Sequence, residues 1–75
     1  MHIGQQIRDT LDAMPGRHSV AWFARQIPCD RSTAYDIFRR SDLDTHLLRK
    51  ISIILNHNFF ADLAEDISDN FVPYI

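Results

Sequence analysis

The sequence predicts a small all-α domain, a compact bundle of about five short helices. Apolar residues recur at intervals of three and four along most of the chain, which is the period of an α-helix with one buried side. Short polar or proline-containing segments interrupt this pattern, and nowhere does polarity alternate for long enough to indicate a strand. With 45% hydrophobic residues among 75, the chain can bury one packed core. We therefore expect a single domain over residues 1–75.

The first two helices are delimited by clear start and stop signals. The first helix is predicted from Ile3 to the Pro-Gly pair at positions 15 and 16. Its expected buried side consists of Ile3, Ile7, Leu11 and Met14. The second helix follows Ser19, a favourable N-cap residue, and Pro28 ends it after about two turns. Its expected buried side consists of Val20, Phe23, Ala24 and Ile27.

Three further helices complete the prediction. A third helix runs from Arg31 to about Arg40, with Asp30 as its N-cap, and we expect it to bury Ala34, Ile37 and Phe38. Asp44 caps a fourth helix, which is the most apolar and should form the centre of the core. Its expected buried residues are Leu47, Leu48, Ile51, Ile54 and Leu55. The C-terminal segment, residues 59–75, is predicted as an acidic helix to about Ser68 and an apolar tail over 71–75.

The charges are unevenly distributed along the chain. The net charge is −2, which argues against a protein that binds nucleic acid mainly through its total charge. However, all eight Lys and Arg residues lie in residues 1–57, where they face six Asp residues. Residues 58–75 carry four acidic residues and no basic residue. The pattern is consistent with a basic side that faces DNA and an acidic side that faces away from it.

The stretch 19–40 carries the main functional signal. It contains two short helices that are apolar on facing sides and are joined by about three residues. A steep crossing over so short a turn needs a small residue where the backbones approach, and Ala24 can provide it. The apolar residues of both helices would then hold the outer side of the third helix rigidly towards solvent.

This stretch resembles the helix-turn-helix of the lambda-repressor-like (Cro and Xre type) DNA-binding family. The resemblance rests on Ala24-Arg25-Gln26-Ile27 followed by Pro28-Cys29-Asp30, and it extends to the flanking helices over roughly residues 1–68. It implies a small transcriptional regulator that binds double-stranded DNA sequence-specifically by inserting helix 31–40 in the major groove. Pro28 departs from the family, which often has a residue tolerant of a left-handed backbone at this position.

The resemblance also implies which residues contact DNA. On the third helix these are Arg31, Ser32, Tyr35, Asp36 and Arg39, and the flanking candidates are Arg40, Arg25 and Gln26. Arg31 has the geometry to pair bidentately with guanine, whereas Arg39 and Arg40 suit phosphates. Asp36 would be repelled by phosphates, so it either accepts a hydrogen bond from cytosine or pairs with a neighbouring arginine. We favour the pairing.

Other interpretations of the same residues stay open. The apolar spacing also fits a plain helical hairpin in a bundle, and Arg39-Arg40 also fits a solvated helix end. The same fold without DNA binding would serve as a protein-protein interaction module through its apolar C-terminal segment. Trp22 lies off the apolar side of its helix, so it either packs against a neighbouring helix or stands exposed as an anchor for a partner.

The C-terminal segment raises a separate alternative. Its apolar residues either fold back on the core or form a homodimer interface that pairs two recognition helices. The residues concerned are Phe59, Phe60, Leu63, Ile67 and Phe71. We favour the homodimer, because one short recognition helix buries little DNA surface.

Several function classes find no support in the sequence. The single Cys29 and the four scattered His residues have no metal-ligand spacing, so we expect neither a metal nor a cofactor. No nucleophile and base, phosphate-binding loop or carboxylate set indicates an enzyme. No apolar run approaches the roughly 20 residues of a membrane span, and the N-terminus lacks the pattern of a signal peptide. We therefore expect a cytoplasmic protein.

Overall fold

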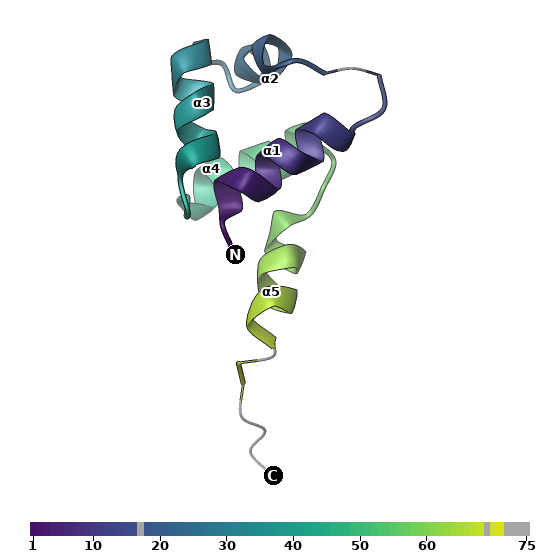
Figure 1. Cartoon of the computed structure of the whole chain (residues 1–75), viewed down its shortest axis with the longest axis vertical. Coiled ribbons are helices and arrows are strands. Elements are labelled where there is room, and N and C mark those ends of the chain that lie inside the picture. The colour runs from purple at the N-terminus through teal and green to yellow at the C-terminus, as the bar shows by residue number, and fades with distance from the viewer. Residues whose placement is uncertain (17, 69, 72–75) are drawn as a thin grey trace.

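The computed structural model describes residues 1–16, 18–68 and 70–71, and over these residues the chain forms five α-helices and no strand (Figure 1). The helices are α1 (Ile3–Ala13), α2 (Val20–Gln26), α3 (Arg31–Arg39), α4 (Thr45–Ile54) and α5 (Phe59–Ser68). The predicted all-helical fold class is thus confirmed. None of these helices is long and apolar enough to cross a membrane. Part of the predicted apolar tail, residues 72–75, lies outside the described residues.

A side chain next to each of the first four helices fixes where that helix begins. Ser19, Asp30 and Asp44 each accept a hydrogen bond from the backbone amide three residues ahead, at 3.1, 2.8 and 2.8 Å respectively. All three predicted N-caps are therefore confirmed. His2 caps α1 in the same way, accepting from an amide through Nδ1 at 3.0 Å, which the sequence analysis did not predict.

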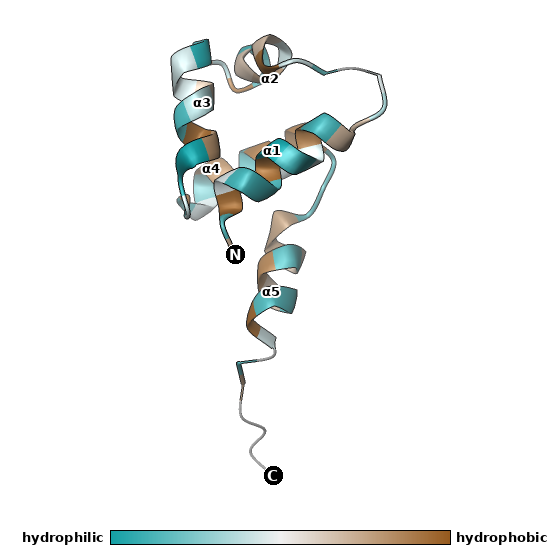
Figure 2. Cartoon of the chain, viewed as in Figure 1, coloured by the Kyte–Doolittle hydropathy of each residue, from teal (hydrophilic) through white to brown (hydrophobic). Residues whose placement is uncertain are grey.

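The core is built from apolar residues of all five helices. Figure 2 shows apolar and polar residues alternating along the turns of α1 and α3, as expected of helices with one buried side. The fully buried large side chains are Phe23, Phe59, Ile3, Ile7, Leu11 and Ile51. In α4 and its C-cap, Leu48, Ile51 and Leu55 are buried, whereas Leu47 and Ile54 are half-buried against the core.

The start of α1 lies against the end of α3. The backbone amides of Ile3 and Gly4 donate to the carbonyls of Ser41 and Arg40, at 3.1 and 2.9 Å. These amides belong to the first turn of α1, where no partner exists within the helix, so the contact satisfies them. A Cβ on Gly4 would lie 2.4 to 2.6 Å from three carbonyl oxygens of residues 37, 38 and 40. Only glycine fits here without displacement of the backbone.

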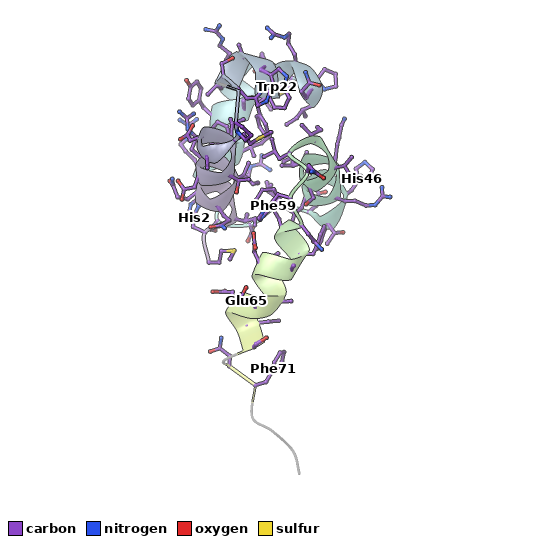
Figure 3. The ribbon with its side chains drawn as sticks, turned by 90° about the vertical axis from the view of Figure 1, so that its right-hand side faces the viewer. His2, Trp22, His46, Phe59, Glu65 and Phe71 are labelled. Atoms are coloured by element: carbon purple, nitrogen blue, oxygen red, sulfur yellow. The ribbon has the colours of Figure 1, made fainter. Side chains whose placement is uncertain are left out.

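One residue of the expected homodimer interface is instead part of the core. Phe59 was predicted on an exposed apolar surface, but its side chain is 0% exposed and points between α1 and α4 (Figure 3). This prediction was wrong because the Asn58 side chain caps α5 and sets the orientation of its first turn: its Oδ1 accepts from the amides of Phe60 and Ala61 at 3.1 and 3.2 Å. That start turns Phe59 inwards and leaves Phe60 at the surface.

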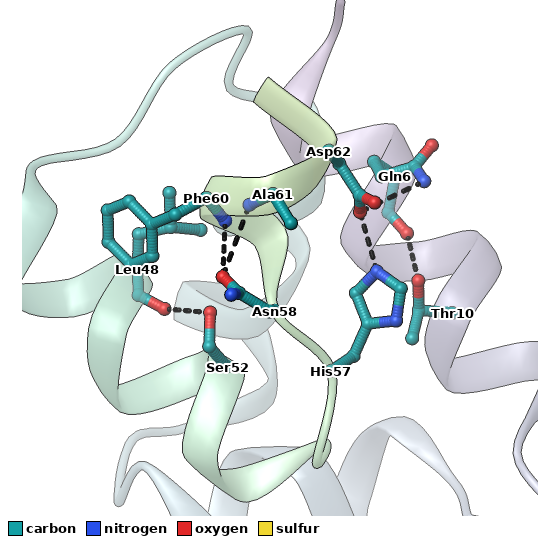
Figure 4. A network of polar contacts seen from close by, with 9 residues as sticks. All are labelled: Gln6, Thr10, Leu48, Ser52, His57, Asn58, Phe60, Ala61 and Asp62. Atoms are coloured by element: carbon teal, nitrogen blue, oxygen red, sulfur yellow. Dashed lines mark hydrogen bonds and ion pairs between the residues drawn. The ribbon is translucent and has the colours of Figure 1, made fainter. Parts of the chain in front are cut away.

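Polar contacts add to this attachment of α5 (Figure 4). The Asp62 carboxylate lies 2.5 Å from Nε2 of His57 and accepts from the Gln6 side-chain amide of α1 at 3.4 Å. The His57 ring also packs against the ring of Phe59, with 4.6 Å between centroids. The N-terminal ammonium of Met1 also donates to the Asp66 carboxylate at 3.2 Å, so the contacts reach the second half of α5. The helix nevertheless projects away from the other four (Figure 1).

Candidate functional site

Helices α2 and α3, which the stretch 19–40 predicts, pack against each other. Phe23 and Ala24 of α2 and Ala34 of α3 are 0 to 3% exposed. Two alanines at this contact let the helix backbones approach closely, which agrees with the role expected for Ala24. The pair carries four Arg against two Asp over residues 19–40, so it is net positive within a net negative chain.

The turn between the two helices closes without a left-handed residue. Ile27 keeps helical backbone angles, φ −73° and ψ −32°, and the amide of Cys29 donates to the carbonyl of Ala24 at 2.7 Å. Among the described residues, positive φ occurs only at Gly16 and Asn56, so Pro28 adopts none. The turn therefore accommodates proline at the position where the family resemblance leads one to expect a left-handed residue.

Two ionisable groups at this turn are perturbed. Partial burial raises the pKa of the Cys29 thiol; the carboxylate of Asp30 adds to this effect and Lys50 opposes it. The thiol is thus held in its neutral form, which suits a packing role better than a reactive one. Hydrogen bonds from Thr33, first its backbone amide and then its side chain, lower the pKa of Asp30, so the α3 cap is charged at neutral pH.

The outer side of α3 is exposed to solvent along its whole length. The exposed residues are Arg31, Ser32, Thr33, Tyr35, Asp36 and Arg39, followed by Arg40 at the C-cap. The buried residues are Ala34, Ile37 and Phe38, as the periodicity predicts. All five α3 residues expected to contact DNA thus share the exposed side, and we call them, with Arg40, the α3 face.

Tyr35 is exposed but held in place. Its ring meets the ring of Phe38 edge-on, with 6.1 Å between centroids and 84° between planes. Phe38 in turn packs on Phe23 of α2 at 5.3 Å, and the Arg8 guanidinium of α1 lies 5.2 Å from its centroid. Phe38, which supports Tyr35, is therefore held by contacts from both α1 and α2. Tyr35 itself is 45% exposed.

Asp36 pairs with Arg39 of the next turn through a hydrogen-bonded ion pair. This is the arrangement that we favoured from the sequence. The two side chains remain 58% and 71% exposed, so the pair is a surface ion pair worth no more than about 1 kcal/mol. Arg39 can therefore exchange Asp36 for a more strongly charged partner at little cost.

Two surface hollows separate Gln26 from the residues of the α3 face. Arg31 and Tyr35 line one shallow hollow together with Ser19, Val20 and Ala21 at the start of α2. Gln26 does not reach this hollow; it lies at the other end of α2, beside α4. Arg25 is exposed on the last turn of α2. The structure thus joins the start of α2, but not Gln26, to the α3 face.

Sequence reasoning missed the residues that surround Gln26. They are His46, Arg49, Lys50, Ile53 and Ile54, all from α4, and they line a hollow of about 380 Å³. The signal was present, because α4 has three basic residues and no acidic residue. The apolar residues that α4 supplies to the core dominate its pattern and mask this basic side.

Trp22 packs within the monomer, and the histidines form no metal-binding cluster among the described residues. Trp22 is half-buried against the core, and its ring lies 4.0 Å from that of His18, so the packed alternative holds rather than the exposed anchor. Within residues 1–16, 18–68 and 70–71, no three His, Cys, Asp or Glu side chains gather as metal ligands would.

No family model, curated protein or solved structure matches the chain.

Proposed function

We propose that this chain binds double-stranded DNA sequence-specifically, by inserting α3 in the major groove, and that it acts as a small transcriptional regulator. The observation that carries the proposal is the α3 face: its polar and basic residues are exposed together while the opposite side of α3 is locked into the core. A nine-residue helix is roughly 14 Å long, and the B-DNA major groove, about 12 Å wide, admits such a helix.

The chemistry of the α3 face suits base reading at one end and phosphate binding at the other. Arg31 at the N-terminal end can donate two hydrogen bonds to one guanine, while Ser32 and Tyr35 can contact adjacent base edges. Arg39 and Arg40 lie at the C-terminal end, where they suit the phosphate backbone. Because Phe38 braces Tyr35, part of this surface is ordered before DNA arrives, which lowers the entropic cost of binding.

The test is duplex binding by fluorescence anisotropy, first with a random-sequence library at low salt and then with the sequences it selects. We expect Arg31→Ala to cost about 1 to 3 kcal/mol at one base position and to relax preference there. Arg39→Ala should weaken binding to all sequences alike and reduce the salt slope by about 1. Arg49→Ala is the matched control, because it removes the same charge from an exposed position of α4 outside the α3 face.

The role of Asp36 can be separated in the same assay. If Asp36 only orients Arg39, Asp36→Asn keeps the base preference and leaves affinity equal or higher, since a negative charge near phosphate is lost. If it reads cytosine, the variant changes preference at one position. Unchanged duplex affinity in both arginine variants, with intact circular dichroism spectra, would defeat the proposal and leave the interaction-module alternative.

A further inference from the structure

A shallow hollow lies between the start of α2 and the N-terminal half of α3. Its volume is about 250 Å³, which is less than the roughly 300 Å³ at which pockets for drug-sized molecules begin. Its lining consists of Ser19, Val20, Ala21, Arg31 and Tyr35. The hollow therefore has room for a small chemical group and is too small for a whole organic ligand.

The lining of the hollow combines apolar side chains with one cation. Val20 and Ala21 are half-buried on the first turn of α2, and Tyr35 adds an aromatic ring that is 45% exposed. Arg31 is exposed, and none of the ion pairs found among residues 1–16, 18–68 and 70–71 involves it. A ligand at this place therefore meets an apolar surface beside a guanidinium that is available to it.

The apolar lining is held in position in the free chain. Val20 packs against the core, and Ser19 Oγ accepts from the amide of Trp22 at 3.1 Å, which fixes the start of α2. The Tyr35 ring meets the ring of Phe38 edge-on, with 6.1 Å between centroids. The hollow is thus formed before a ligand arrives, so little side-chain entropy is lost on binding.

The major groove of DNA offers one kind of small apolar group, the C5-methyl group of thymine, which 5-methylcytosine also carries. Guanine instead presents two acceptors with which an arginine can pair. Arg31 and Tyr35 are four residues apart, which is about 6 Å along α3, and stacked base pairs are about 3.4 Å apart. If Arg31 pairs with a guanine, the hollow therefore lies within about two base pairs of that guanine.

We propose that this hollow receives the C5-methyl group of a thymine within two base pairs of the guanine that Arg31 reads. The inference rests on the proposed function, because it names a feature of the duplex that α2 and α3 recognise together. It makes Val20 and Ala21 specificity-determining residues, although neither belongs to the α3 face. It also means that 5-methylcytosine is preferred over cytosine at the same position.

A backbone phosphate is the other group of DNA that can approach Arg31. In the hollow, however, a phosphate would bring its hydrated charge against the half-buried side chains of Val20 and Ala21, which offer it no hydrogen bond. A methyl group contacts both side chains favourably and leaves the guanidinium to pair with guanine. The apolar lining therefore favours the methyl group over the phosphate.

The test uses duplexes that differ by single methyl groups. Once a site has been selected from random DNA, each of its thymines is replaced in turn by uracil, and affinity is measured by fluorescence anisotropy. We expect uracil to weaken binding about fourfold at one position, because burial of one methyl group is worth about that factor. This position should lie within two base pairs of the guanine for which Arg31→Ala relaxes preference. There, 5-methylcytosine should exceed cytosine by a similar factor.

A double-mutant cycle ties the methyl group to the hollow. Val20→Ala removes part of the lining, so the ratio of thymine to uracil affinity should fall from about four to below about two. Because the ratio compares two duplexes with the same variant, any loss of folded protein cancels. Ile54→Val is the matched control: it shortens another half-buried side chain, on α4, and should leave the ratio unchanged.

The outcomes separate this inference from the proposed function. Equal affinity for thymine and uracil at every position, with the preference that depends on Arg31 retained, would overturn the methyl contact and leave DNA binding by α3 intact. An unchanged ratio in Val20→Ala would place the methyl group outside the hollow. A salt slope reduced by about 1 in Arg31→Ala, with base preference unaltered, would put a phosphate there instead. Failure to bind any duplex would overturn both.

Discussion

Gly4 shows how a single residue can carry a contact between distant parts of the chain. There is no room for a Cβ on Gly4, because the carbonyl oxygens of residues 37, 38 and 40 would lie 2.4 to 2.6 Å from it. Gly4 therefore allows the first turn of α1 to donate hydrogen bonds to the end of α3. The conformation of Gly4 is ordinary helix, so its requirement is one of space and not of backbone angles.

We expect Gly4→Ala to destabilise the fold by about 1 to 3 kcal/mol, measured by urea unfolding. Alanine normally stabilises a helix relative to glycine by about 1 kcal/mol, so a loss of stability identifies the clash with α3. Increased stability in the variant would contradict the close approach. If α3 binds DNA as proposed, the variant also weakens that binding, since it displaces the segment that ends the α3 face.

The helices themselves were largely predictable, and their caps explain why. Ser19, Asp30 and Asp44 act on amides within three residues, so the signal is local. The buried side of α3 was also predicted correctly: Ala34, Ile37 and Phe38, spaced by three and four residues, are the ones that are buried. The burial of Phe59 was not predicted because Phe59 and Phe60 are both apolar, and the position of the Asn58 cap decides which one turns inwards.

The neighbouring pair Phe59 and Phe60 provides a matched test of how α5 is attached. Phe59→Ala should cost about 3 to 5 kcal/mol, because it empties a fully buried site beneath α5. Phe60→Ala should cost much less in the monomer, because its side chain is already partly exposed. Thermal unfolding at low protein concentration measures both. Equal losses of stability would contradict the attachment of α5 through Phe59.

The net charge of −2 is unevenly distributed over the molecule. The net positive α2–α3 pair and the acidic α5 belong to different parts of the structure, and Figure 1 shows α5 directed away from α2 and α3. A duplex on the α3 face would therefore meet four Arg and only two Asp from α2 and α3, while the acidic residues of α5 would lie at a distance. Screening by salt reduces the effect of the distant charges further.

Duplex affinity should fall with salt in proportion to the number of phosphate contacts. If Arg25, Arg39 and Arg40 each neutralise one phosphate, the logarithmic slope is about −2.7, and raising salt from 50 to 200 mM weakens binding roughly fortyfold. Anisotropy titrations at several salt concentrations measure this slope. A slope near zero would contradict phosphate contacts by these residues, whatever the affinity at a single salt concentration.

Features that depend on neighbours along the chain could be predicted: the helices, three N-caps, the buried side of α3 and the pairing of Asp36 with Arg39. Each arises from groups within about one helical turn, where backbone geometry alone brings them together. The close approach at Gly4, the burial of Phe59 and the position of Gln26 beside α4 depend on how separate helices cross. Packing of side chains from distant segments sets those crossings, and no local pattern encodes it.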